Sequence, residues 1–211
     1  MSDRHDSFYS RTMAPRMASR LCAMRPFTHQ RRKIVPQAHG VVLEVGIGSG
    51  LNLPHYRLDQ VTRVLGIDPN ERMLRMCERS PRCDRPAVEC ISSAAESMPI
   101  ESNTADSAVM TYALCSVQNP TAVLSEVRRV LKPGGRLLLC EHGRAMKAAA
   151  ARWQNRLTPG WKMMAMGCHL NRDPTLMLAE AGFVFESIER FVLRPFPSLL
   201  GTHYIGTARP A

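Results

Sequence analysis

Three regularly spaced glycines are the strongest sign of a binding site in this sequence. Gly46, Gly48 and Gly50 directly follow the short apolar run 41–45, which contains Glu44. Glycines let a backbone turn tightly and approach a ligand closely, with the amino end of the next helix pointing at that ligand. The third glycine comes two residues after the second, so the loop differs from the dinucleotide fingerprint G-x-G-x-x-G. The loop therefore predicts a ligand site at the end of a buried strand.

An aspartate at the end of the next apolar run is the second candidate. Asp68 lies 18 residues beyond Gly50. An acidic residue at this position in an α/β unit can hydrogen-bond the two hydroxyls of a ribose. The alternative is that Asp68 caps the helix that follows it. Together with the glycines, the binding role is favoured.

Apolar runs that alternate with helical patterns define the elements that position these residues. Runs typical of buried strands lie at 41–45, 61–67, 87–91, 107–110 and 136–140. Helical patterns lie at 70–79 and 120–131, and residues 132–135 (Lys-Pro-Gly-Gly) end the second one. This alternation predicts a parallel sheet with right-handed crossovers. Two further runs, 183–193 and 203–208, predict a closing hairpin with one antiparallel strand.

The composition indicates one globular domain. The chain has 211 residues, 45% hydrophobic and 22% charged, which argues against wholesale disorder. It contains no run of about 18 apolar residues, so no transmembrane anchor is expected. Seven cysteines without a C-x-x-C pair argue against a disulfide framework and a zinc ribbon. The histidines do not form the usual helical pairs, so no metal site is expected. Free thiols are typical of a reducing compartment, so we expect a cytoplasmic location.

The excess positive charge is concentrated at the start of the chain. The net charge is +10, and residues 1–35 contribute eight Arg or Lys against Asp3 and Asp6. Prolines at 15, 26 and 36 divide the segment 1–39 into short basic helices. We expect these helices to form an N-terminal arm or lid over a pocket in the domain 40–211. The alternative is a grip on nucleic-acid phosphates.

Four motifs in a fixed order resemble those of the class I methyltransferases that use S-adenosylmethionine. They are Glu44-x-Gly46-x-Gly48-x-Gly50, Asp68-Pro69, Ala95-Glu96-x-Met98-Pro99 and Leu131-Lys132-Pro133-Gly134-Gly135. The resemblance covers residues 40 to about 208. It implies a Rossmann-like α/β fold: a seven-stranded, mostly parallel sheet with one antiparallel strand near the C-terminus and helices on both faces. It also implies S-adenosylmethionine as cofactor and S-adenosylhomocysteine as product.

The same resemblance implies a role for each matching residue. Gly46 and Gly48 would lie against the methionine moiety, and Glu44 would order the glycine loop or hold the amino group. Asp68 would bind the ribose, and Tyr112 and Ala113 would lie beneath the sulfonium. The remaining cofactor-binding candidates are Asn52, Pro69, Ala95 and Glu96, the last two beside the adenine. Relatives often have an aspartate directly before the Ala-Glu pair, where this sequence has Ala94.

Two further stretches, 114–142 and 153–172, resemble a methyltransferase-like group that methylates small thiols. The resemblance implies a small-molecule thiol as substrate. The animal members have a hydrophobic anchor ahead of the domain, whereas this sequence has the basic arm there, so membrane anchoring is not expected. Methylation of a thiol needs a thiolate, because a free alkyl thiol is mostly protonated at neutral pH. A dry, apolar pocket then favours reaction with a sulfonium.

Candidate residues for this chemistry lie in the second half of the chain. His142, at the end of the fifth strand, is the predicted general base, with a structural role as the alternative. Arg172 or His169 would stabilise the thiolate, and Asp173 would orient either of them. Substrate-binding candidates are Trp153, Trp161 and Met164 as apolar pocket walls, with ordinary helix core as the alternative, and Tyr9 closing over the cofactor.

Other acceptors stay open at this stage. Related domains methylate carbon, oxygen or nitrogen atoms of quinone precursors and phospholipid head groups, although an aromatic content of 6% is low for a quinone pocket. An RNA methyltransferase would use the basic arm, but the arm lacks interleaved aromatic residues. No nucleic-acid partner is therefore expected. The sequence does not set the oligomeric state.

Overall fold

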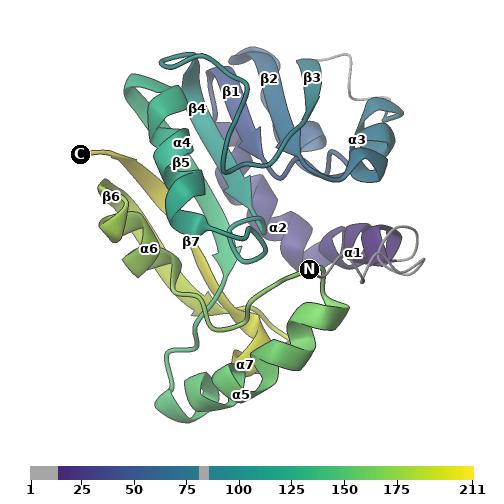
Figure 1. Ribbon diagram of the computed structural model, residues 1–211, viewed down its shortest axis with the longest axis vertical. Coiled ribbons are helices and arrows are strands. Elements are labelled where there is room, and N and C mark those ends of the chain that lie inside the picture. The colour runs from purple at the N-terminus through teal and green to yellow at the C-terminus, as the bar shows by residue number, and fades with distance from the viewer. Residues whose placement is uncertain (1–13, 81–85) are drawn as a thin grey trace, which may run out of the picture.

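The computed structural model describes residues 14–80 and 86–211, which form a single mixed sheet with helices on both faces (Figure 1). The strands are β1 (Gly40–Val45), β2 (Val61–Asp68), β3 (Ala87–Ser92), β4 (Ala105–Thr111), β5 (Leu131–His142), β6 (Phe183–Val192) and β7 (Thr202–Pro210). Their order is β3-β2-β1-β4-β5-β7-β6. Only β7 runs against its neighbours β5 and β6. The predicted fold, with its single antiparallel strand, is confirmed.

Two clusters of buried residues cover the two faces of the sheet. On one face, α4 (Pro120–Val130) and α6 (Pro174–Glu180) pack against side chains that include Leu43 and Leu139. On the other face, α2 (Arg25–Ile34) and α3 (Glu71–Glu78) pack against side chains that include Val42 and Leu138. Neighbouring strand residues point to opposite faces, so a run that is apolar throughout can serve both clusters.

Three further helices lie outside this packed centre. They are α1 (Ala14–Cys22), α5 (Ala148–Met164) and α7 (Ser198–Gly201). In Figure 1, α5 and α7 lie at the foot of the molecule, and α1 extends to one side. Short 3-10 turns at Val35–Gln37 and Leu53–His55 complete the elements. Within the described residues, no helix combines the length and the apolar character needed to cross a membrane.

The two predicted helices begin with caps that the sequence encodes. The side chain of Asn70 accepts hydrogen bonds from the backbone of Arg72 and Met73 at the start of α3. Asn119 caps α4 in the same way, with Pro120 at the first helical position. These contacts satisfy amide groups that have no partner inside the helix.

The fifth strand is longer than the sequence predicts. It begins at Leu131, which pairs with Ala105 of β4, and a register shift follows before regular pairing resumes at Arg136. The Lys-Pro-Gly-Gly segment at 132–135 does end the helix, as predicted, but it belongs to this irregular start of β5. Propensity alone indicates the turn, whereas the pairing with β4 decides where the strand begins.

The topology reverses direction between β1 and β4. The chain proceeds from β1 outward through β2 and β3, then returns and continues from β4 to β5 on the other side. Loops at the carboxyl ends of β1 and β4 therefore lie side by side, which is where open α/β sheets bind their ligands. The glycine loop follows β1, and the segment 112–116 follows β4, so the fold brings both predicted parts of the site together.

Candidate active site

The glycine loop packs directly against the loop that follows β4. Gly46, Gly48 and Gly50 have φ angles of 72°, 56° and 77°, a region that side chains strongly disfavour. A Cβ atom on Gly46 would lie 2.7 Å from the Cβ of Ala113, so no larger residue fits there. The glycines are thus needed both for the turn and for the close approach of the two loops.

Asp68 fixes the far side of this loop. Its carboxylate accepts a hydrogen bond from the backbone N–H of Gly48 at 3.0 Å and another from Asn70 at 2.8 Å. Partial burial raises the pKa of Asp68, and the two backbone hydrogen bonds oppose that rise. Pro69, the next residue, is exposed. The ribose-binding role of Asp68 stays a prediction, and its position at the end of β2 is compatible with it.

Glu44 lies beneath the glycine loop in a closed hydrogen-bond network. Its carboxylate accepts from Asn52 Nδ2 at 2.9 Å and from the Tyr56 hydroxyl at 2.6 Å. Asn52 also donates to the hydroxyl of Thr111 at 3.0 Å, which links the network to the end of β4. Burial raises the pKa of Glu44 to about 7, against the opposing effect of these hydrogen bonds. The network orders the loop, and Tyr56 is a member that the sequence analysis missed.

The Ala-Glu pair lies where a third loop approaches the same edge of the sheet. Ala95 is buried. Glu96 accepts hydrogen bonds from the backbone N–H groups of Gln118 and Asn119, at 3.0 and 3.1 Å. Glu96 therefore anchors the segment that leads into α4, and its predicted place beside the adenine is untested.

The loop after β4 begins with a strained residue. Tyr112 has a φ angle of 59°, and its ring packs edge-on against Phe27 of α2 with 5.3 Å between the centroids. The guanidinium of Arg31, also from α2, lies 4.8 Å from the centroid of the Tyr112 ring. Arg31 is only 4% exposed, and its Nε has no partner among the described residues. The N-terminal segment thus contributes a buried cation to the site.

Sequence reasoning missed Phe27 and Arg31, although a signal was present. The two residues are four apart in α2, and Ile34 follows three residues later. This spacing places an arginine on the apolar face of the helix. A hydrogen bond of 2.7 Å between the hydroxyls of Ser19 and Ser49 also links α1 to the glycine loop. The proposed boundary at residue 39 stays a prediction, but α2 packs as part of the domain.

Glu141 holds the next part of the same loop. Its Oε1 accepts from the backbone N–H groups of Ala113 and Leu114, at 2.6 and 2.8 Å. The side chain is fully buried, and burial raises its pKa. Its second oxygen has no partner within the described part of the chain. Glu141 fixes the position of Ala113 relative to the glycine loop.

The three predicted catalytic residues surround the continuation of this loop. His142 Nε2 lies 3.0 Å from the sulfur of Cys168. Arg172 donates to the carbonyl of Leu114 at 2.7 Å, and the backbone N–H of His169 donates to the carbonyl of Cys115 at 2.8 Å. Burial would lower the pKa of His142, but the contact with Cys168 and the negative charge of Glu141 raise it overall.

Asp173 does not contact either of the residues it was expected to orient. Its side chain caps α6 by accepting from the backbone N–H of Thr175 at 3.0 Å. Its other oxygen lies 3.6 Å from Arg190. The cap explains the aspartate without a catalytic role.

The predicted substrate-binding residues separate in space. Trp161 donates from Nε1 to the sulfur of Cys168 at 3.3 Å, so it lies at the site. Trp153 is 55% exposed and stacks with Arg156, and Met164 is 64% exposed at the end of α5. Tyr9 lies outside the described residues. Of these candidates, Trp161 lies beside Cys168, and the substrate-binding role of each candidate stays a prediction.

The tertiary structure also gathers three metal-ligating side chains that no local spacing reveals. They are Cys115 after β4, His142 at the end of β5 and Cys168 between α5 and α6, and their ligand atoms lie within 4.8 Å of one another. The expectation that no metal constellation exists rested on helical pairs and C-x-x-C spacing. That reasoning cannot detect residues 26 or more positions apart in the chain.

Comparison with known proteins identifies the class. Residues 43–139 match a family model described as a methyltransferase domain. Thiol S-methyltransferase TMT1B of Rattus norvegicus is 36% identical over 172 residues, or 79% of this chain and 69% of the relative. The chain belongs to the class I S-adenosylmethionine-dependent methyltransferases, and S-adenosylmethionine is its methyl donor. The glycine loop at the reversal of the sheet fits this donor, because it brings backbone without side chains to the edge where such sheets bind ligands, and a Cβ on Gly46 would clash with Ala113.

A second relative and a solved structure agree with this family. Thiol S-methyltransferase TMT1B of Homo sapiens is 31% identical over 199 residues, covering 87% of this chain and 80% of the relative. Among solved structures, a SAM-dependent methyltransferase from Thermotoga maritima superposes with a TM-score of 0.68. It covers 96% of this chain and 98% of its own at 19% identity, which supports the fold alone.

Proposed function

We propose that this protein transfers the methyl group of S-adenosylmethionine to the thiol of a small molecule. The observation that supports it most strongly is the 36% identity to a thiol S-methyltransferase across 79% of the chain. The human thiol S-methyltransferase is 31% identical and matches over 87% of the chain, so the similarity extends well beyond the glycine loop. S-adenosylmethionine supplies a methyl group on a positively charged sulfur, and the acceptor must meet it as a thiolate.

We assign the donor side to the edge of the sheet around β1 and β2. The backbone N–H of Gly48 donates to the carboxylate of Asp68 there, which joins the glycine loop to the end of β2. We infer that Arg31 pairs with the carboxylate of the donor's methionine moiety. Its guanidinium is buried and close enough to Glu44 to lower the pKa of that side chain, which places a cation beside the loop.

The acceptor side lies around the ends of β4 and β5 and the turn that carries Cys168. Arg172 and His169 hold the carbonyl groups of Leu114 and Cys115. We therefore assign both residues to positioning this loop, rather than to direct contact with the thiolate. Trp161, whose indole faces Cys168, supplies an apolar surface for the acceptor.

The test is a methyl-transfer assay with matched acceptors: an alkyl thiol, its hydroxyl analogue, a catechol, a phospholipid and bulk RNA. Product mass and release of S-adenosylhomocysteine are measured for each. Methylation of the thiol alone supports the proposal. Methylation of another acceptor, with the thiol inert, would overturn it.

The role of Arg31 has its own test. Arg31→Met should weaken S-adenosylmethionine binding by about 10- to 100-fold, because a charged hydrogen bond in a buried setting contributes about 1.5–3 kcal/mol. Arg32→Met is the matched control, since Arg32 is exposed on the same helix. Isothermal titration gives both dissociation constants. Equal affinities of the two variants for S-adenosylmethionine would contradict a role of Arg31 in donor binding.

A further inference from the structure

The cluster of Cys115, His142 and Cys168 differs from an ordinary buried contact. Two sulfurs and one imidazole nitrogen converge from three separate elements, with all ligand atoms within 4.8 Å. Cys115 is buried, while His142 and Cys168 are partly exposed. Two of the three residues are therefore not sealed from the solvent.

The distances in this cluster suit a tetrahedral metal. A Zn²⁺ ion with bonds of about 2.3 Å to sulfur and about 2.0 Å to nitrogen holds its ligand atoms about 3.5–3.8 Å apart. His142 Nε2 and Cys168 Sγ are 3.0 Å apart, and the most distant pair of the three is no more than 4.8 Å apart. The tetrahedral values lie between these two distances.

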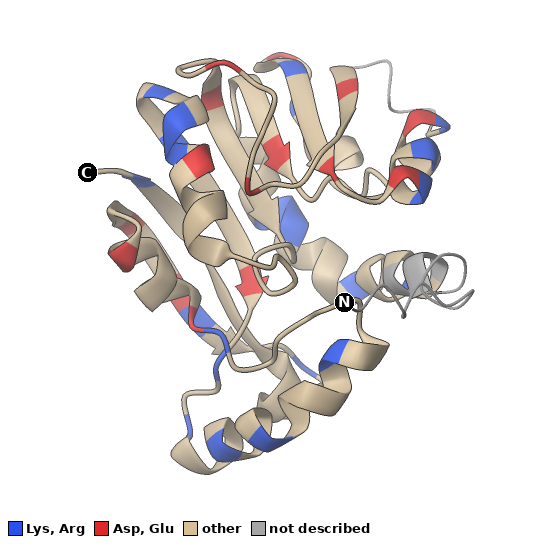
Figure 2. Ribbon diagram, viewed as in Figure 1, with Lys and Arg blue, Asp and Glu red and all other residues tan. Residues whose placement is uncertain are grey.

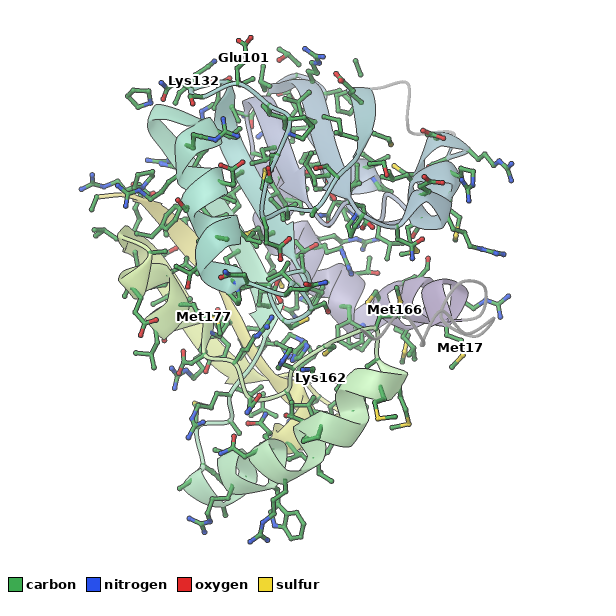
Figure 3. All side chains as sticks on the ribbon, in the orientation of Figure 1. Met17, Glu101, Lys132, Lys162, Met166 and Met177 are labelled. Atoms are coloured by element: carbon green, nitrogen blue, oxygen red, sulfur yellow. The ribbon has the colours of Figure 1, made fainter. Side chains whose placement is uncertain are left out.

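Surrounding contacts already orient the ligands. Trp161 donates its indole N–H to the sulfur of Cys168 at 3.3 Å. The backbone N–H of His169 holds the carbonyl of Cys115, and Glu141 fixes the loop directly before it. Figure 3 labels Lys162, in the last turn of α5, and Met166, in the turn that leads from α5 to Cys168. Met166 and Gly167 in this turn have φ angles of 50° and 82°. Such supporting contacts are typical of metal sites.

We propose that Cys115, His142 and Cys168 bind a thiophilic divalent cation, Zn²⁺, with its fourth position open to the substrate thiol. Two thiolates and an imidazole are a donor set that favours this ion. Three protein ligands with one open position are the arrangement of catalytic zinc sites. The inference rests on the proposed thiol methylation and deepens it, because it assigns the means by which the thiol becomes a thiolate.

The position of the cluster matches that role. Cys115 is two residues from Ala113, which packs against Gly46 of the donor loop. The substrate thiol loses its proton to water as its sulfur binds the cation. A bond then forms between that sulfur and the methyl carbon while the carbon–sulfonium bond breaks. The resulting thioether is neutral and a weaker ligand, so it leaves along with S-adenosylhomocysteine.

Metal binding is tested first, without donor or acceptor. The full chain, kept reduced and free of metal, is titrated with Co²⁺ and with Zn²⁺ in competition with a chromophoric chelator. One ion per chain and the thiolate-to-cobalt absorption of a tetrahedral site are expected. Cys168→Ser should weaken binding by about a hundredfold or more, since even outer contacts of metal sites contribute 10- to 100-fold. Cys90→Ser, in β3 at the far edge of the sheet, is the control.

Circular dichroism confirms that each variant is folded before it is titrated. Absence of stoichiometric binding, or binding that Cys168→Ser leaves unchanged, would overturn the site. Because this readout needs no methyl transfer, it separates failure of the metal site from failure of the proposed function. If the protein binds Zn²⁺ but methylates another acceptor, the metal site is upheld and the proposed thiol substrate is overturned.

The open position has a separate readout. An alkyl thiol added to the Co²⁺ protein should change its visible spectrum, and removal of the metal should abolish thiol methylation while leaving S-adenosylmethionine binding intact. Cys22 lies close enough to Cys168 for the two thiols to interact electrostatically, and it could fill the fourth position instead. The contrary result is that added thiol leaves the Co²⁺ spectrum of the parent protein unchanged while Cys22→Ser alters that spectrum. This result would mean that Cys22 closes the site as a fourth ligand, and it would overturn the catalytic role of the metal.

Two substitutions of His142 test whether this residue acts as a metal ligand or as a general base. His142→Cys keeps a metal-binding side chain, whereas His142→Gln removes both ligand and base. As a ligand, His142→Cys should retain Co²⁺ binding and part of the activity, and His142→Gln should lose both. Equal loss of activity in the two variants, with metal binding unchanged, would return His142 to the role of base.

Discussion

At the scale of single residues, the proposed donor site depends on the absence of a side chain at Gly46 and on the buried carboxyl group of Glu44. Gly46 and Ala113 face each other so closely that an added Cβ would lie 2.7 Å from its neighbour. The side chain of Glu44 lies directly beneath, with both oxygens bonded. The loop is therefore shaped by steric fit above and by a buried carboxyl group below, and each can be altered separately.

Gly46→Ala should destabilise the protein by about 2–4 kcal/mol, because it combines a left-handed backbone with a steric clash. S-adenosylmethionine binding should weaken as the two loops separate. Gly160→Ala is the matched control: it lies inside α5, and its added Cβ would meet nothing within 4 Å. That change should instead stabilise the helix by about 0.5–1 kcal/mol. Urea unfolding measures both, and similar effects would contradict the steric argument.

Glu44 makes stability depend on pH. Burial raises its pKa in the folded state to about 7 from an ordinary 4.5, so between those values the folded chain holds a proton that the unfolded chain has lost. The free energy of unfolding should therefore fall as pH rises through this range. Glu44→Gln should remove about 2–3 kcal/mol of that fall between pH 5 and pH 8. Urea unfolding at both values checks it, and parallel pH curves for the two proteins would refute it.

At the scale of elements, one buried amide joins α5 to the segment after β5 and to α7. Gln154 is 1% exposed, accepts from the backbone of Ala145 at 2.8 Å, and donates to the carbonyls of Gly143 and Leu199 at 3.0 and 2.9 Å. It thereby joins the end of β5 to α7 through the helix. The position of α5 matters for the site because the turn after it carries Cys168.

Gln154→Ala should cost about 2–4 kcal/mol, since it leaves two buried backbone groups and one partly buried one without partners. Asn155→Ala is the control, because the hydrogen bond of Asn155 with Asn171 is exposed, and it should stay within about 0.5 kcal/mol of the parent. Hydrogen exchange should show faster exchange in α5 for Gln154→Ala alone. Unchanged protection there would mean that other contacts hold the helix.

At the scale of the whole molecule, positive charge is concentrated on the parts that surround the acceptor side. Residues 143–172 contain six Arg or Lys and no Asp or Glu. Figure 2 shows the basic positions along α5, while α3 carries both acidic and basic residues and an acidic residue lies on α6. A positive electrostatic potential of this kind favours the approach of anionic ligands, and added salt weakens it. It adds to the basic character of the N-terminal segment.

Donor binding should stabilise the whole fold, because the site joins loops from both halves of the sheet. At a concentration one hundred times its dissociation constant, S-adenosylmethionine should add about 2.7 kcal/mol. For a domain of this size that corresponds to an increase in Tm of about 5–10 °C. Differential scanning fluorimetry measures it, with S-adenosylhomocysteine as a second ligand and adenosine as a control. No shift with either ligand at saturation would contradict the assigned donor site.

The sequence by itself determined the donor half of this protein. The glycine loop, Asp68 and Glu44 are local signals, because each lies within a few residues of a strand end whose apolar pattern is readable. Strand and helix alternation likewise predicted the sheet and its antiparallel strand. These features depend on short-range periodicity and turn chemistry, which a single sequence contains.

Only the tertiary structure decided the acceptor half. Arg31 joins Tyr112 across 81 positions, and Cys115, His142 and Cys168 converge from three elements. Asp173, expected to orient a neighbour, caps α6, and Trp153 lies exposed while Trp161 faces Cys168. The reason is physical: strand order and helix packing set which distant side chains meet, and no local pattern records that outcome.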